Sequence, residues 1–306
     1  MASRPPPSAK PGGAANEHPK PAPSPLIHRG NYNPNPLGTT TFIGLRTLDP
    51  LLQYNLLAHG WGASLLSSLH LPSLPLHAHP PSDYLSYPSL PKDSAHILTA
   101  LETVSPSDLP ISRLVLLLMS TGSTLKQIYW LLRLSHEEFT PSTAISVAGY
   151  NTVVNTLASL LLLCPSTSSA LASGPKIPLP GRDNLALSLP TAVGIVLYAV
   201  GISLETISEV QRERFKRDAR NKGKIITTGL WGWARHINYG GYTLWRTGYG
   251  LAAGGWVAGG LVAAWHAWIF VRSSVPELRG YMMGKYKEQW VKYEEKVKWV
   301  LIPGVY

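Results

Sequence analysis

Cysteine and charged residues are both scarce in this sequence. It contains one cysteine, Cys164, so no disulfide can form within the chain, and a thiol at the end of an apolar run is expected to be buried and inert. Only 14% of the 306 residues are charged, whereas 44% are hydrophobic. This balance excludes most soluble classes and favours an integral membrane protein.

The sequence also lacks a recognised nucleic-acid-binding motif, although its net charge is +10. Its Lys and Arg residues border apolar runs, where basic residues ordinarily mark the cytoplasmic side of a membrane. Binding to nucleic acid is therefore not expected. No hydrophobic segment near Met1 has the form of a signal peptide, so we expect the first internal apolar helix to direct insertion.

The N-terminal region is dominated by proline. Residues 1–36 contain ten prolines, together with Gly, Ser, Ala and Lys, and offer no apolar face to bury. We therefore predict that residues 1–49 form a disordered cytoplasmic tail.

The predicted fold is an all-α integral membrane protein with about six transmembrane helices. Apolar runs of suitable length cover residues 51–71, 114–134, 142–164 and 189–207. The run 242–271 is too long for one crossing, and Gly254-Gly255 interrupts it, so we predict a short helical hairpin that turns there.

The distribution of charge orients these helices. The basic segments 211–224 and 272–306 are expected on the same, cytoplasmic side, so both termini are predicted to be cytoplasmic and the acidic 72–110 loop to lie outside. The second basic segment spaces apolar residues at three to five positions and predicts an amphipathic C-terminal helix. This helix is expected either to lie on the membrane surface or to fold back as a lid over residues 229–242.

A few polar residues interrupt the apolar runs. Lys126 is expected either to face a partner or cavity or to extend along its helix toward the membrane surface. Asn151 and Asn155 share one face of a helix, and hydrogen bonding between helices is the preferred interpretation over the lining of a substrate cavity.

The segment 229–242 concentrates glycine, aromatic and basic residues. Arg235, His236 and Asn238 place a cation, an imidazole and an amide within four positions, and Gly240-Gly241 permits close approach of the backbone. This combination suits a cofactor that bears phosphate. An interfacial aromatic belt with Arg235 on lipid phosphate is the simpler alternative.

The C-terminal third carries an ordered set of motifs. They are, in order, Glu205, Glu209, Gln211, Phe215-Lys216, Gly223-Lys224, Gly229-Leu230-Trp231, Arg235-His236, Asn238-Tyr239, Gly241, Tyr286, Trp290, Tyr293, Val297 and Ile302-Pro303. This order resembles the steroid 5-alpha-reductase C-terminal superfamily, most closely its DUF1295 branch. The resemblance covers about a third of the chain, and Arg-His-x-x-Tyr alone is shared with methyltransferases.

The resemblance implies an NADPH-dependent membrane reductase of a carbon–carbon double bond in a sterol-like or other lipophilic substrate. It implies a location in the endoplasmic reticulum membrane, a cofactor-binding region at 209–306 and a substrate cavity formed by helices within 50–208. No metal is expected. The residues implied to bind the cofactor are Glu205, Glu209, Gln211, Lys216, Arg235, His236, Asn238, Tyr239 and Arg279.

The sequence departs from the family pattern at two positions. Ile237 replaces a Pro, which affects only the turn. Tyr242 replaces a Glu that helps to polarise the substrate in the 5-alpha-reductases. A phenol donates a hydrogen bond at neutral pH where a carboxylate does not, so Tyr242 is a candidate proton donor, with His236 and Tyr239 as further candidate catalytic residues.

Three function classes stay open at the level of sequence. They are the NADPH-dependent reductase, an S-adenosylmethionine-dependent enzyme similar to the isoprenylcysteine methyltransferases, and a lipid-binding membrane protein without catalysis. Membrane lipids and a lipophilic small molecule are the expected partners. The sequence specifies neither the substrate nor the oligomeric state.

Overall fold

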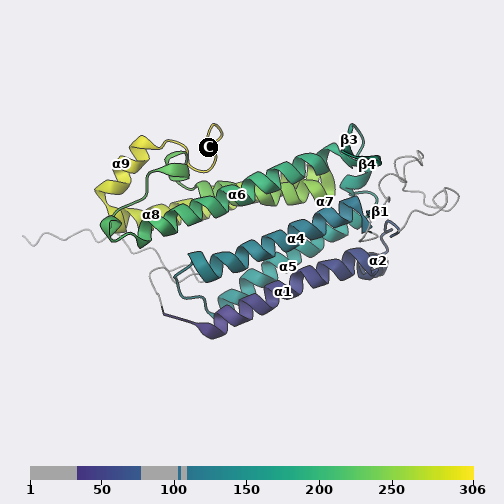
Figure 1. Cartoon of the computed structure of the whole chain (residues 1–306), viewed down its shortest axis with the longest axis horizontal. Coiled ribbons are helices and arrows are strands. Elements are labelled where there is room, and N and C mark those ends of the chain that lie inside the picture. The colour runs from purple at the N-terminus through teal and green to yellow at the C-terminus, as the bar shows by residue number, and fades with distance from the viewer. Residues whose placement is uncertain (1–32, 77–102, 105–108) are drawn as a thin grey trace, which may run out of the picture.

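The computed structural model describes residues 33–76, 103–104 and 109–306, without the side chains of 103–104 and 182–185. Helices dominate it, and Figure 1 shows the long ones running along one common axis. The helices are α1 Pro36–Ala58, α2 Trp61–Ser68, α4 Ile111–Tyr129, α5 Pro141–Leu163, α6 Leu189–Arg217, α7 Ile237–Ile269, α8 Val275–Tyr286 and α9 Glu288–Lys296. The strands are β1 Thr103–Val104, β2 Leu109–Pro110, β3 Lys176–Leu179 and β4 Arg182–Ser188.

The starts of the long helices follow from local sequence. Asn35, Thr140 and Ser188 cap α1, α5 and α6 through side-chain oxygens that accept backbone N–H groups, and proline occupies the first or second helical position of each. A polar cap followed by Pro is a strong start signal, because Pro has no N–H group that would need an acceptor in the first turn. The predicted runs 142–164 and 114–134 therefore match α5 and α4, the latter extended by a π-helical turn at 130–134.

Two predictions near the N-terminus are wrong. Residues 36–49, predicted to be disordered, form the first half of α1, and the predicted span 51–71 divides at Gly60, which has a φ of 79°, between α1 and α2. Helix α1 was missed because its polar residues, among them Arg46 and Asp49, are buried against neighbouring helices. Residues 1–32 of the predicted tail and most of the 72–110 loop lie outside the described residues.

Shorter elements connect the helices at the two ends of the bundle. The antiparallel hairpin β3–β4 lies within the predicted loop 165–187, and β1 pairs with β2. The predicted single C-terminal helix is two helices, α8 and α9, because Lys287 adopts a φ of 49° between them.

Arg113 joins α4 to the α1–α2 region by donating to the carbonyl oxygens of Leu57, Leu74 and Pro75 at 2.7–2.8 Å.

The helical hairpin is confirmed. Within α7, Gly254 and Gly255 leave the helical region, and Gly255 has a φ of 67° that favours glycine. The two arms then lie side by side, since the Tyr242 ring is 5.3 Å from the His266 ring and the Tyr239 ring is 4.6 Å from the Phe270 ring.

Among the described residues, three helical stretches are long and apolar enough to cross a membrane: Pro141–Leu163, Leu189–Arg217 and Ile237–Tyr286. They support an all-α integral membrane protein. In Figure 1, α1, α4 and α5 lie together beside α6 and α7. The full set of six crossings stays a prediction, because α1 and α4 are more polar.

Polar side chains inside the bundle hydrogen-bond between helices. Lys126 of α4 forms an ion pair with Glu205 of α6, so the expectation of a partner for this lysine is confirmed. Asn155 donates to Asp49 of α1 at 2.7 Å, and Asn151 accepts from Gln127 of α4 at 2.9 Å. The interhelical role preferred for the two asparagines is thus also confirmed, and such bonds satisfy polar groups that lipid cannot.

Helix α6 packs closely on the first arm of α7. Gly194 and Gly201 of α6 face Gly248 and Gly241 of α7, and a Cβ atom added to any of them would come within 3.0 Å of backbone atoms of the other helix. Small residues at such a crossing let two helix backbones approach each other.

Substitution of Gly201 by Ala is expected to destabilise the protein by about 1–3 kcal/mol, because the added methyl group overpacks this contact. The measurement is the thermal unfolding of the detergent-solubilised protein. The matched control is Gly149→Ala in α5, where an added Cβ meets nothing within 4 Å and helix propensity favours Ala. Equal melting temperatures for the two variants would contradict the close contact.

Candidate functional site

The C-terminal segment folds back over residues 229–242. The backbone N–H groups of Arg235 and His236 donate to the carbonyl oxygens of Trp299 and Val300 at 3.0 and 2.8 Å. Tyr293 of α9 is buried and donates its hydroxyl to the carbonyl oxygen of Trp231 at 2.5 Å, and this burial raises its pKa. Of the two placements expected for the tail, the lid is the observed one.

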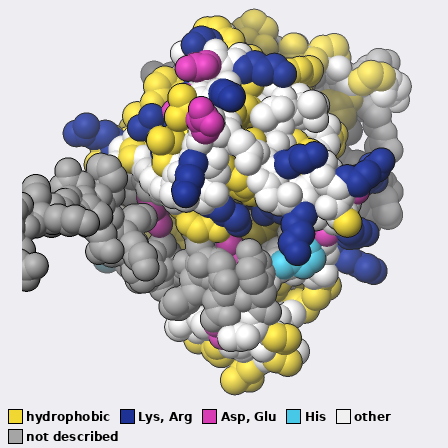
Figure 2. All heavy atoms as spheres, turned by 90° about the vertical axis from the view of Figure 1, so that its left-hand side faces the viewer, with side chains coloured by type: hydrophobic (Ala, Val, Ile, Leu, Met, Phe, Trp, Pro, Cys, Tyr) yellow, Lys and Arg dark blue, Asp and Glu magenta, His cyan; other side chains and the backbone are white. Residues whose placement is uncertain are grey.

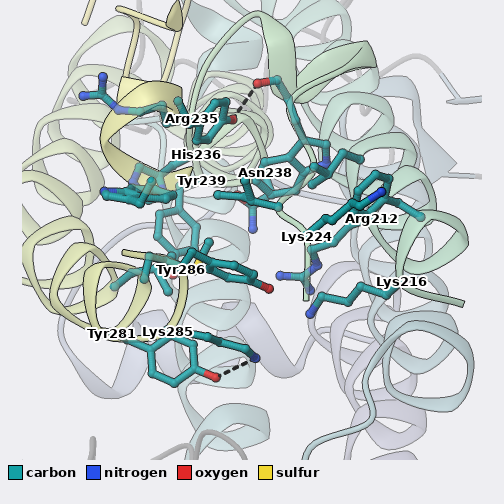
Figure 3. Close-up of a pocket in the computed structure, with 18 of the residues that line it drawn as sticks. Arg212, Lys216, Lys224, Arg235, His236, Asn238, Tyr239, Tyr281, Lys285 and Tyr286 are labelled. Atoms are coloured by element: carbon teal, nitrogen blue, oxygen red, sulfur yellow. Dashed lines mark hydrogen bonds between the residues drawn. The ribbon is translucent and has the colours of Figure 1, made fainter. Parts of the chain in front are cut away.

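A pocket lies between this lid and the end of α6. Figure 3 shows Arg212, Lys216 and Lys224 on one side of it and side chains of α8 on the other. Five residues predicted to bind a cofactor line it: Lys216, Arg235, His236, Asn238 and Tyr239. The structure therefore brings the centre of the Arg-His-x-Asn-Tyr motif to the same cavity as Lys216 of α6.

The charge of the pocket lining is strongly unbalanced. Its cationic residues are Arg212, Lys216, Lys224, Arg235 and Lys285, whereas Glu137 is its one carboxylate among the residues that the structure describes. Figure 2, which views this end of the molecule, shows Lys and Arg side chains gathered around it. Several cations around one cavity raise the local concentration of anions, and the pocket is suited to an anionic ligand.

Arg235 also has a structural role. Its guanidinium donates to the carbonyl oxygen of Val297 at 2.8 Å and to that of Glu294 at 3.4 Å, at the end of α9. Cationic donors at a helix C-terminus satisfy carbonyls that lack helical partners. Arg235 therefore holds the lid in place while lining the pocket.

Asn238 has a fixed orientation. Its Nδ2 donates to Glu209 Oε1 at 2.8 Å, and a carboxylate only accepts, so the amide oxygen must face elsewhere. That Oδ1 atom is buried and has no hydrogen-bond partner among the described residues. Asn238 thus lines the pocket and keeps one buried acceptor without a partner, and Glu209, which also pairs with Arg212, positions both side chains.

Four residues predicted to bind the cofactor do not line the pocket. Glu205 pairs with Lys126 and accepts from Trp245 Nε1 at 2.7 Å, and Glu209 lies behind Asn238. Gln211 accepts the N–H of Leu230 at 2.9 Å, beside Gly229, which has a φ of 61°. Direct cofactor binding by these three residues stays a prediction, but their observed contacts hold the motif in place.

Arg279 is the fourth of these residues. It forms a two-point ion pair with Glu294 at 2.7 and 2.9 Å across the outside of the lid. The Arg279 guanidinium holds the pKa of the Glu294 carboxyl below its usual range. A role in cofactor binding also stays a prediction for Arg279.

Aromatic rings connect the pocket to the helical bundle. His236 is buried and stacks with Tyr239, with ring centroids 5.7 Å apart. Phe270 of the returning arm stacks on Tyr239 and meets the edge of Tyr242, whose ring centroid is 5.8 Å away. Tyr242 does not line the pocket and lies one helical turn farther into the bundle.

Sequence reasoning missed several lining residues. Arg212 and Lys224 belong to the basic segment that was interpreted as a cytoplasmic marker, and Lys224 is part of the Gly-Lys motif. Lys285 and Tyr281 lie on α8, one turn apart, and the Lys285 amine donates to the Tyr281 hydroxyl at 3.1 Å. The spacing of the tail was a usable signal, because it places these residues on one helix face.

The fold and the pocket define a helical membrane protein with a pocket lined by cationic side chains at the basic end of its bundle. A family model described as a protein of unknown function, DUF1295, matches residues 153–297. The chain belongs to this DUF1295 family, which confirms the resemblance.

Individual relatives extend this comparison. A probable O-methyltransferase, ustE, of Ustilaginoidea virens is 32% identical over 256 residues, which cover 84% of this chain and 82% of that protein. A Delta(14)-sterol reductase, ERG24B, of Gibberella zeae is 26% identical over 38% of this chain and 34% of its own length. A 7-dehydrocholesterol reductase of Danio rerio is 25% identical over 40% of this chain and 31% of its own length. Relatives that are named as enzymes support enzymatic activity in this chain.

Removal of the Arg235 side chain is expected to loosen the lid. In Arg235→Ala, hydrogen exchange of the backbone amides of residues 288–301 should become faster, because the end of α9 loses its cationic donor. Arg279→Ala is the control, since an ion pair with a half-exposed partner contributes at most about 1 kcal/mol. Equal exchange in the two variants would show that Arg235 does not hold the lid.

Proposed function

We propose that this protein is a membrane-embedded, NADPH-dependent reductase of a carbon–carbon double bond in a lipophilic substrate. The observation that carries the proposal is the pocket lining, with five cationic side chains against one carboxylate. The partial similarity to sterol reductases supports it.

The two candidate cofactors, NADPH and S-adenosylmethionine, differ in net charge. NADPH carries a diphosphate and a further phosphate, and each suits charge-assisted hydrogen bonds from Arg or Lys. S-adenosylmethionine has a sulfonium and an ammonium group against one carboxylate, so it is a net cation. The pocket lining is therefore complementary to NADPH and repels S-adenosylmethionine.

The residues divide the binding of NADPH between them. Lys216, Lys224, Arg212 and Lys285 would hold phosphate groups, and Asn238 Oδ1 would accept a hydrogen bond from an amide such as that of nicotinamide. Tyr239, whose ring is stacked between His236 and Phe270, would line the inner end. When bound, this cofactor supplies a hydride.

The substrate side of the reaction belongs to the bundle in this proposal. Tyr242 lies one turn from Tyr239 and carries a hydroxyl that can donate a proton to the substrate. A lipophilic substrate would reach it from the membrane. The basic end of the molecule is then expected in the cytosol, and we propose the endoplasmic reticulum as the membrane concerned.

A second candidate function is an S-adenosylmethionine-dependent methyltransferase. One observation favours it: a relative that matches 84% of this chain is named as a probable O-methyltransferase. In this reading the same pocket would bind S-adenosylmethionine, with Glu137 facing the sulfonium or ammonium group.

A thermal-shift comparison tests the proposal. NADPH is expected to raise the melting temperature of the detergent-solubilised protein more than NADH, S-adenosylmethionine or S-adenosylhomocysteine does. Lys216→Ala and Lys285→Ala should each weaken NADPH binding by about tenfold, because each removes one charge-assisted contact. Added salt should weaken binding as well, since it screens these charges.

Lys292→Ala provides the matched control, because Lys292 is exposed on α9 and does not line the pocket. Stabilisation by S-adenosylhomocysteine without any by NADPH would replace the reductase with the methyltransferase. Absence of both effects would favour a lipid-binding protein without catalysis.

A further inference from the structure

A second group of polar residues lies inside the bundle, away from the pocket, around Arg246 of α7. The Arg246 side chain is 1% exposed. Its guanidinium donates to Asn155 Oδ1 at 3.2 Å, to Asn151 Oδ1 and to the Tyr242 hydroxyl at 3.3 Å. All three acceptors are neutral, and within the described part of the chain Arg246 forms no ion pair with a carboxylate.

The other charges in this part of the bundle are balanced. Arg46 pairs with Asp49 at 3.0 Å, and Lys126 pairs with Glu205. Arg246 therefore leaves one positive charge uncompensated between α1, α4, α5 and α7. A buried cation is costly in an apolar surrounding, and intramembrane ionisable residues commonly mark functional sites.

Tyr242 contacts Arg246 and is less buried than it. Because its oxygen accepts from Arg246 Nε, its hydroxyl hydrogen is directed to another acceptor. The guanidinium also lies over the rings of Trp245 and Tyr242, at 4.3 and 5.6 Å from their centroids. An anionic oxygen that accepted a hydrogen bond from the Tyr242 hydroxyl would thus have a fixed cation close behind that hydroxyl.

The cluster reaches the outer surface of the bundle at Tyr150. This residue is 40% exposed, and its hydroxyl lies 3.2 Å from His266 Nε2. His266 Nδ1 donates to the carbonyl oxygen of Val262 at 2.8 Å, so Nε2 is the acceptor and Tyr150 is the donor. Two phenols and an imidazole therefore lie between Arg246 and the exposed surface of the bundle.

We propose that Tyr242 and Arg246 form an oxyanion-binding pair for the substrate. The ligand class is a lipophilic compound whose oxygen carries or develops negative charge: a carboxylate, a phenolate or a conjugated carbonyl. Tyr242 donates the hydrogen bond to that oxygen, and Arg246 acts through Tyr242 as a positioning residue. This inference rests on the proposed function, since it names the substrate chemistry of the same enzyme.

The test uses the full chain in lipid nanodiscs and two probes of similar shape, 2-naphthoate and uncharged 2-methoxynaphthalene. Equilibrium dialysis, corrected against empty nanodiscs, is expected to show protein-dependent binding of 2-naphthoate that exceeds binding of the ether. Tyr242→Phe should weaken 2-naphthoate binding by about tenfold, because it removes one hydrogen bond to a charged group. Binding of the ether should not change.

Variants of Arg246 distinguish the effect of its positive charge on binding from the effect of its side-chain shape. Arg246→Lys is expected to keep part of the preference for 2-naphthoate, and Arg246→Met to remove it. Unchanged binding in both Tyr242→Phe and Arg246→Met, or equal binding of the two probes by the wild type, would overturn the proposal. If Arg246→Met does not fold, Tyr242→Phe decides, because its ring keeps the packing of the native side chain.

NADPH stabilisation of the wild-type protein is measured in parallel and separates the two proposals. A preference for 2-naphthoate that depends on Tyr242, without any effect of NADPH, would leave the oxyanion-binding pair standing and remove the reductase. Stabilisation by NADPH without a preference for 2-naphthoate would support the reductase and rule out the oxyanion-binding pair.

Discussion

The close packing of α6 on the first arm of α7 determines the geometry of both polar sites. Glycines at the crossing remove the side chains that would otherwise separate the two backbones. Residues next to the crossing on the two helices then meet directly, so that Glu205 accepts from the Trp245 indole and Glu209 accepts from the Asn238 amide. Hydrogen bonds between helices become possible at these positions because the backbones are close.

Sequence patterns predicted the parts of the fold that depend on local signals. The bounds of α5 follow from the cap at Thr140 and Pro141 and from an apolar run of the right length, and the hairpin follows from Gly254-Gly255 together with the positive charge on both sides. The first half of α1 could not be predicted in this way. In the sequence its polar residues are typical of a solvent-exposed segment. Their burial is favourable only because they hydrogen-bond to residues of α4 and α5.

The same distinction applies to the pocket. The motif predicted that Arg235, Asn238 and Tyr239 lie near Lys216, and the structure places all four around one pocket. Sequence does not tell which side of α6 faces the cavity. Glu205 and Glu209 are one turn apart and point to α7, whereas Arg212 and Lys216, also one turn apart, point to the pocket. Once the position of α7 is known, the helical period of α6 therefore shows which residues face α7 and position the motif and which residues line the pocket.

The departure at position 242 and the presence of Arg246 have a common physical explanation. A Glu at position 242 would lie one turn from Arg246 and form an ion pair with it, which would neutralise the buried cation and leave no hydrogen-bond donor for a substrate. A Tyr at this position accepts from Arg246 and still has a proton to donate. The uncompensated charge is then available to an oxygen outside the protein. The residue that breaks the family pattern is therefore consistent with a different electrostatic solution to substrate binding, in which the cation supplies the polarisation and the phenol supplies the contact.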